Sequence, residues 1–302
     1  MRLLGFLFLI VSALIIPGLI LRIKSIAAGR KGPGIWQPYR DIAILFAKGQ
    51  VFSNTTGLIF QIAPAINLSC IIAAAMLLPF GRYGSLISFD GDFVYFLYIL
   101  ALGRFFSIIS ALDTGSSFEG MGASREALFS MLAEPAFFIL FAALAIVTGH
   151  TSFSGIFSEY TISGDHNILI MTLIGVFVLF QSSLVETCRV PVDDPKTHLE
   201  LTMIHEVMIL DNSGFDKALI HISTYLKQAI YGLLIYNLIT PFKLNLVFQI
   251  IIFVLVQALY AITAGLIESF RARNKMNRNP KFILTISAVA WIAFVIILIL
   301  KK

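Results

Sequence analysis

The stretch ETCRVPVDDPKTHLELTMIHEVMILDNSG, from Glu186 to Gly214, decides how the rest of the chain is read, because it is the most polar segment of a very apolar sequence. Long hydrophobic runs flank it on both sides. Its ionisable residues include Glu186, Arg189, Asp193, Asp194, His198, Glu200, His205, Glu206 and Asp211. Such a dense group of charges is costly next to lipid unless water or protein surrounds it.

The composition indicates a membrane protein. Of 302 residues, 58% are hydrophobic and only 13% are charged, with a mean hydropathy of +0.89. A soluble domain carries about a quarter charged residues. The formal net charge of +5 is small and concentrated in loops, which favours a role in topology over nucleic-acid binding. We therefore expect an all-α fold with one polytopic membrane domain over residues 1–302, and no nucleic acid as a partner.

Eight apolar runs approach the roughly 20 residues that a helix needs to cross a bilayer. They are Leu3–Leu21, Gly57–Phe80, Phe93–Leu112, Ala127–Gly149, Ile168–Val185, Ala218–Thr240, Leu244–Ile267 and Phe282–Leu300. Fifteen basic residues lie in the loops after the first, third, fifth and seventh runs, against five on the other side. The positive-inside rule places these loops in the cytoplasm and both termini outside. The expected location is the inner (cytoplasmic) membrane of the cell.

Several residues in or near the apolar runs carry charge. The third loop, ALDTGSSFEGMGASRE, has three glycines that permit close backbone approach or a helix break. Glu134 falls inside the fourth run, where a carboxylate indicates function unless the helix starts later. Lys227 either snorkels to the cytoplasmic edge or faces an internal carboxylate. Glu268 is expected at the interface, and a short amphipathic helix is expected from Trp36 on the membrane surface.

Pro191 and Pro195 exclude a continuous helix through Arg189–Pro195. A new helix is expected over His198–Leu210, capped by Asp194 or Thr197, with Glu200 and Glu206 pointing to different sides. Zinc metalloproteases carry two histidines four residues apart, but His205-Glu206 is followed by Ile209, so that enzyme class is excluded.

The two cysteines, Cys70 and Cys188, cannot supply a four-cysteine cluster or a zinc site. We therefore expect no cofactor on this chain, and any redox centre that works with it must lie on another subunit.

The segment ETCRVPVDDPKTHLE resembles the signature loop of the membrane subunit shared by respiratory complex I (subunit 1, or H in bacteria) and the energy-converting membrane-bound NiFe hydrogenases. The matching residues are Glu186, Arg189, Pro191, Asp193 and Glu200. The segments HLELTMIHEVMILDNSG and ALDTGSSFEGMGASRE are more similar to the hydrogenase branch, which includes formate hydrogenlyase subunit 4 and hydrogenase-4 component C.

This resemblance implies a non-catalytic membrane subunit that anchors a hydrophilic redox arm and couples electron transfer to ion translocation. It implies three kinds of partner within the lipid bilayer and at its surface: a NiFe hydrogenase large subunit, an iron–sulfur small subunit and antiporter-like membrane subunits. The NiFe centre and the iron–sulfur clusters would then belong to the partners.

Clustered carboxylates at a site of low dielectric constant have coupled protonation and can pass protons when a neighbouring charge changes. We expect the relay to comprise Glu134, Glu186, Glu200 and Glu206, with Arg189 pairing with them or setting their protonation. The residues expected to shape the loop or face the redox arm are Glu119, Arg125, Asp193, Asp194, His198 and His205. For each of them the alternative is a structural ion pair that braces the loop.

Two other functions remain open. The first is the quinone-site membrane subunit of a complex I-like NADH:quinone oxidoreductase. The second is a free-standing ion or solute transporter, although the sequence lacks the mirrored broken helices that an internal repeat would give. The residues do not choose between protons and sodium ions, nor do they identify the electron donor.

Overall fold

The structure is a computed structural model that describes residues 2–81, 83–160, 166–194, 203–240 and 244–300. The regular elements of these residues are helices. In chain order they are α1 (Arg2–Ala27), α2 (Gln37–Ala47), α3 (Leu58–Met76), α4 (Asp92–Asp113), α5 (Ser117–Thr148), α6 (Phe153–Glu159), α7 (His166–Glu186), α8 (His205–Met208), α9 (Gly214–Ile239), α10 (Leu246–Phe270), the 3₁₀ turn η1 (Met276–Arg278) and α11 (Asn279–Leu300).

Eight of these helices are long and apolar enough to cross a membrane: α1, α3, α4, α5, α7, α9, α10 and, together with η1, α11. Each of the eight predicted apolar runs overlaps one of them, so the all-α membrane fold is confirmed. The reason is that a helix satisfies its backbone polar groups internally, as the hydrocarbon region demands. An even number of spans places both chain ends on the same side of the bundle.

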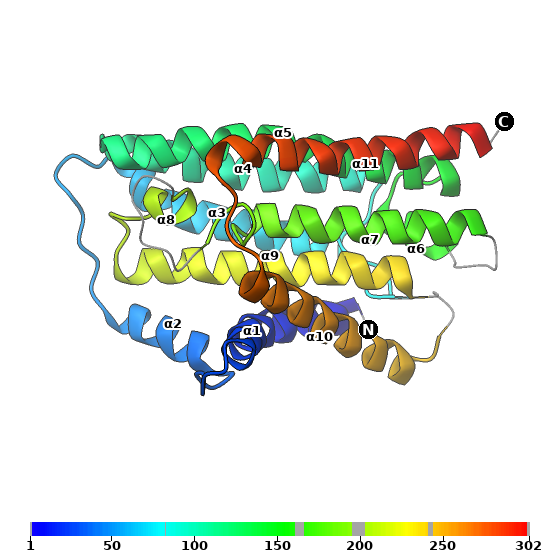
Figure 1. The fold of residues 1–302 in the computed structure, drawn as a ribbon, viewed down its shortest axis with the longest axis horizontal. Coiled ribbons are helices and arrows are strands. Elements are labelled where there is room, and N and C mark those ends of the chain that lie inside the picture. The colour runs from blue at the N-terminus through cyan, green and yellow to red at the C-terminus, as the bar shows by residue number, and fades with distance from the viewer. Residues whose placement is uncertain (1, 82, 161–165, 195–202, 241–243, 301–302) are drawn as a thin grey trace.

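Helix α9 is the most deeply buried of the spanning helices. Figure 1 shows α3, α4, α5, α7, α9 and α11 side by side along the long axis, with α1 and α10 packed together at one edge. Helix α9 contacts α1, α2, α3, α7 and α10, and 72% of its spanning window is buried, the largest share of the eight. We call the end of the bundle that carries segments 28–57, 114–116, 187–194, 203–213 and 271–278 the basic end.

Helix α5 begins at Ser117, ten residues before the predicted start at Ala127, so that boundary was wrong. The polar first turns are stable as helix because they pack against the loop that contains α8. A Cβ at Gly122 would lie 2.9 Å from the Ile204 carbonyl oxygen, which shows how closely the two backbones approach. The early start also places Glu134 well inside a helix and excludes the alternative of a later start.

The predicted helix over His198–Leu210 was wrong in extent. Met203 and Ile204 are not helical, and α8 is a single turn that ends at Met208. Its start is held across the loop, because Asp193 Oδ2 accepts the backbone N–H groups of Ile204 at 3.2 Å and His205 at 3.0 Å. Residues 195–202, which contain the predicted relay residue Glu200, the predicted interface residue His198 and one of the two expected caps, Thr197, lie outside the described residues.

The short amphipathic helix predicted from Trp36 is confirmed as α2. It packs against α9, where the rings of Phe46 and Phe215 meet edge to face with centroids 5.3 Å apart.

Candidate functional site

Arg104 of α4 joins two carboxylates from different helices. Its Nη2 donates to Glu186 Oε1 at 2.6 Å, and its Nη1 donates to Glu134 Oε1 at 3.3 Å. Glu134 comes from the middle of α5, and Glu186 is the last residue of α7. The Arg104 and Glu186 side chains are 7% and 8% exposed, whereas Glu134 is 37% exposed. Two of the predicted relay residues therefore share one buried cation.

Lys227 supplies a second cation to the same carboxylate. Its Nζ lies 3.8 Å from Glu186 Oε2, and its side chain is 13% exposed. The sequence left open whether this lysine reaches the interface or faces an internal carboxylate, and the structure shows the second. Each oxygen of Glu186 thus faces its own cation, one from α4 and one from α9.

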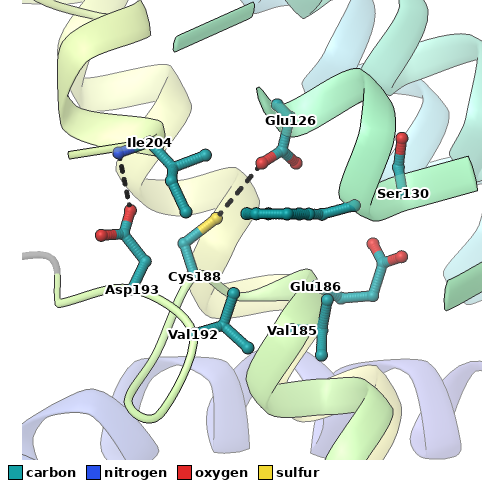
Figure 2. Close-up of a pocket in the computed structure, with 9 residues that line it drawn as sticks. Glu126, Ser130, Val185, Glu186, Cys188, Val192, Asp193 and Ile204 are labelled. Atoms are coloured by element: carbon teal, nitrogen blue, oxygen red, sulfur yellow. Dashed lines mark hydrogen bonds between the residues drawn. The ribbon is translucent and has the colours of Figure 1, made fainter. Parts of the chain in front are cut away.

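A small cavity beside these ion pairs is lined by residues of α5, α7 and the loop that follows α7. Figure 2 shows Glu126, Ser130, Glu186, Cys188 and Asp193 around it. Its volume of about 10 Å³ is near the lower bound for one water molecule. The Cys188 thiol donates to Glu126 Oε2 at an Sγ–O distance of 4.0 Å. We call Arg104, Glu126, Glu134, Glu186 and Lys227 together the charged cluster.

A second ion network lies at the edge formed by α1 and α10. Arg189 pairs with Glu268, and Lys24 Nζ lies 3.4 Å from the other oxygen of Glu268. With its amide oriented to suit both groups, Gln228 accepts from Arg189 Nε and Nη2, each at 2.8 Å. The Glu268 side chain is 3% exposed, so protein covers it, and its position at the membrane interface stays a prediction. Arg189 was expected beside the relay carboxylates, but it pairs with Glu268, which was not among them.

Asp193 holds the loop after α7 in place. Besides accepting from two backbone groups of the next loop segment, its Oδ1 pairs with Arg273 Nη2 at 2.8 Å. Two more bonds come from the segment after α10. The Asn274 N–H of the linker donates to the Pro191 carbonyl at 2.9 Å, and the side chain of Asn279, the first residue of α11, donates to the Val192 carbonyl at 3.0 Å. The loop is thus clamped between the start of α8 and the C-terminal linker.

The first turns of α5 hold the same loop from the other side. Glu119, fully buried, accepts the backbone N–H of Asp211 at 3.0 Å, and Arg125 donates to the Met203 carbonyl at 2.9 Å. These contacts show that Glu119 and Arg125 brace the loop. A contact of either residue with a redox arm stays a prediction.

The remaining predicted residues lie apart from the charged cluster. Asp194 faces Lys24 at 4.0 Å, and Glu206 of α8 faces Lys217 at the same distance. His205 lines a separate cavity of about 30 Å³ beneath α8, together with Asn67 and Asn212. The structure therefore brings Glu134 and Glu186 together but leaves Glu206 outside that group.

Burial shifts two titratable groups in the loop. It raises the pKa of the Cys188 thiol well above its ordinary value, and the nearby Glu126 acts in the same direction, so the thiol stays protonated and can donate. Burial lowers the pKa of His205 below 6.5, against the opposing effect of Glu206, which keeps the imidazole neutral at neutral pH.

A much larger apolar cavity, of about 570 Å³, lies between α1, α2, α3 and α9. Its polar groups are the hydroxyls of Tyr39 and Tyr225, and the other lining side chains are aliphatic or phenylalanine. A cavity of this size and character can hold an apolar molecule or an acyl chain.

Several residues of these networks were not among the predicted site residues, and they include Arg104, Glu126, Lys227 and Glu268. A charge inside an apolar run was the signal available for Arg104 and Lys227. Glu126 and Glu268 gave no such signal, because each lies at the end of an apolar run where a solvated charge is ordinary.

Almost the whole chain matches a known family. Residues 1–299 match the model of the family described as NADH dehydrogenase. The chain belongs to the NADH dehydrogenase family. Hydrogenase-4 component C of Escherichia coli (strain K12) is 31% identical over 284 residues, which cover 92% of this chain and 86% of that protein. Formate hydrogenlyase subunit 4 of the same organism is 28% identical over 279 residues, 89% of each chain.

Two further similarities are more distant. An NADH-quinone oxidoreductase subunit of Rickettsia canadensis (strain McKiel) is 26% identical over 194 residues, 62% of this chain and 57% of that protein. A chain in the structure of the membrane-bound sulfane sulfur reductase, an archaeal respiratory membrane complex, superposes with a TM-score of 0.81, at 20% identity and 98% coverage of both chains. That last likeness concerns the fold alone.

Proposed function

We propose that this chain is the non-catalytic membrane subunit of an energy-converting hydrogenase-type complex, where it anchors the redox arm and couples electron transfer to proton translocation. The single observation that carries the proposal is the ion chain Glu134–Arg104–Glu186–Lys227, which links α5, α4, α7 and α9 inside the bundle. Burying paired charges inside the bundle costs desolvation free energy, so their presence there indicates a functional role. A carboxylate between two cations changes its proton affinity when either cation moves.

The exposed Glu134 supports a partner within the membrane. It belongs to the ion chain, yet more than a third of its side chain is uncovered on the side of the bundle. A carboxylate in that position is costly against lipid. We infer that an antiporter-like membrane subunit covers α4 and α5 there and continues the relay.

The basic end supports a partner outside the membrane. Residues 187–194 are held against the segment that follows α10 by the Asp193–Arg273 pair and by the bond from Asn279 to Val192 at that end. In the described residues, no three His, Cys, Asp or Glu side chains form a metal-binding group. The proposal accordingly assigns the NiFe centre to a large subunit and the iron–sulfur clusters to a small subunit, both docked at the basic end on the cytoplasmic side of the inner membrane.

The test is purification of the tagged chain in mild detergent, followed by identification of the co-purifying subunits and assay of hydrogen evolution from a reduced dye. We expect NiFe and iron–sulfur subunits to co-purify. In reconstituted vesicles, Glu186→Gln should lower the number of protons moved per hydrogen formed. A chain that purifies alone and monodisperse contradicts the proposal.

The apolar cavity favours one second candidate, the membrane subunit of a quinone-reducing complex. The cavity lies between α1, α2, α3 and α9 and is large enough for a prenyl chain. Quinone reductase activity in the purified complex, lost on Ala75→Trp, would establish this candidate. Hydrogen evolution without quinone reduction would reject it.

A further inference from the structure

The charged cluster contains more acid than base. Its carboxyl groups are Glu126, Glu134 and Glu186, whereas its cations are Arg104 and Lys227. Unbalanced charge is costly where the dielectric constant is low, so buried groups neutralise themselves by binding a proton. One carboxyl of the three is therefore expected to be a neutral acid.

The contacts identify which carboxyl this is. Glu186 faces a cation at each oxygen, at 2.6 and 3.8 Å, and Glu134 accepts from Arg104 at 3.3 Å. Glu126 forms no ion pair among the described residues, and its hydrogen bond comes from a thiol, which is a weak donor. Cations and strong hydrogen-bond donors stabilise the ionised form of a carboxyl group. Glu126 has the weakest such contacts of the three, so it is the carboxyl that binds the proton most readily.

The other charges that face Glu126 do not change this balance. They come from α4, α7, α9 and the loop after α7, and they are Arg104, Glu186, Lys227 and Asp193. Arg104 and Lys227 are already shared with Glu186, and Asp193 is neutralised by Arg273. The Cys188 thiol is protonated and contributes no charge.

We propose that Glu126 is the resident proton carrier of the charged cluster and delivers its proton to Glu186 across the small cavity that both residues line. One water in that cavity would accept the proton from the Glu126 carboxyl and release another to the Glu186 carboxylate. The step leaves Glu126 ionised and Glu186 neutral, with no change in total charge. This transfer rests on the proposed coupling function, but the proton on Glu126 does not.

The experiment is infrared difference spectroscopy of the purified complex at neutral pH, where an ordinary glutamate is ionised. A neutral carboxyl shows a carbonyl stretch that shifts in D₂O. We expect this band to disappear in Glu126→Gln and to move, but persist, in Glu126→Asp. The matched control Glu159→Gln, at an exposed position on the opposite end of the bundle, should keep it.

A spectrum that is unchanged in Glu126→Gln, or a band that keeps its frequency in Glu126→Asp, overturns the proposal. The Glu126→Asp variant controls for loss of the band through misfolding, because it retains a carboxylic acid at this position on a side chain that is one methylene shorter. The infrared result tests whether Glu126 carries a proton even if the complex moves no protons. An absence of proton pumping would contradict the proposed function and would leave the protonation of Glu126 unaffected. If the complex does pump, Glu126→Gln should lower the proton-to-electron ratio by more than Glu159→Gln does.

Discussion

At the scale of single residues, Arg104 links two carboxylates that lie 30 and 82 positions further along the chain. Removing its charge leaves Glu186 buried with Lys227 alone at 3.8 Å. Breaking a buried ion pair from one side costs about 3–5 kcal/mol. We expect Arg104→Met to lower the free energy of unfolding by that order, measured by unfolding in mixed detergent micelles. Arg104→Lys should lower the free energy of unfolding by less, since lysine keeps the positive charge but cannot bridge the two carboxylates.

His205 gives the loop a dependence on pH. Because burial lowers its pKa below 6.5, the folded chain binds a proton there more weakly than the unfolded chain does. Its contribution to stability is full above about pH 6.5 and is lost as the pH falls toward the lowered pKa. Backbone amides of residues 203–213 should therefore exchange hydrogen faster, relative to the intrinsic rate, at about pH 5.5 than at about pH 7.5. In His205→Gln that difference should shrink, and an equal difference in both proteins would contradict the assignment.

At the scale of elements, Gly18 of α1 sets the position of the loop that leads into α2. A Cβ at Gly18 would lie 1.8 Å from the Ile35 carbonyl oxygen, a backbone atom that cannot rotate away. Gly18→Ala should push the loop outward and cost about 1–3 kcal/mol, as other overpacking changes do. Limited trypsin digestion should then cut faster at Lys31. The matched control is Gly34→Ala, whose added methyl meets open space and should leave the digestion rate unchanged.

The elements also show how far the sequence predicts this structure. All eight spans could be predicted because an apolar run long enough to cross the bilayer has few alternatives. Glu134 was identified as a site residue because a carboxylate inside an apolar run has few structural explanations. Glu186 was identified because it lies in the polar segment that resembles the signature loop of the family. The pairing of Arg189 with Glu268 could not be predicted, since it depends on how α10 packs beside the loop after α7. The extent of α8 was predicted wrongly for a similar reason, because Asp193 holds its start through bonds to residues 11 and 12 positions further along the chain.

At the scale of the whole molecule, the sidedness of the bundle decides which end meets the redox arm. The basic end should face the cytoplasm, since basic residues are retained there during insertion. Both natural cysteines are buried, so a new surface cysteine can be labelled over a low background. In intact spheroplasts an impermeant maleimide should label Glu159→Cys, at the end of α6, and should label Gly34→Cys only after the membrane is permeabilised. The reverse pattern would place the ion chain, the clamped loop and the proposed docking surface on the outer side, where a cytoplasmic hydrogenase arm could not reach them.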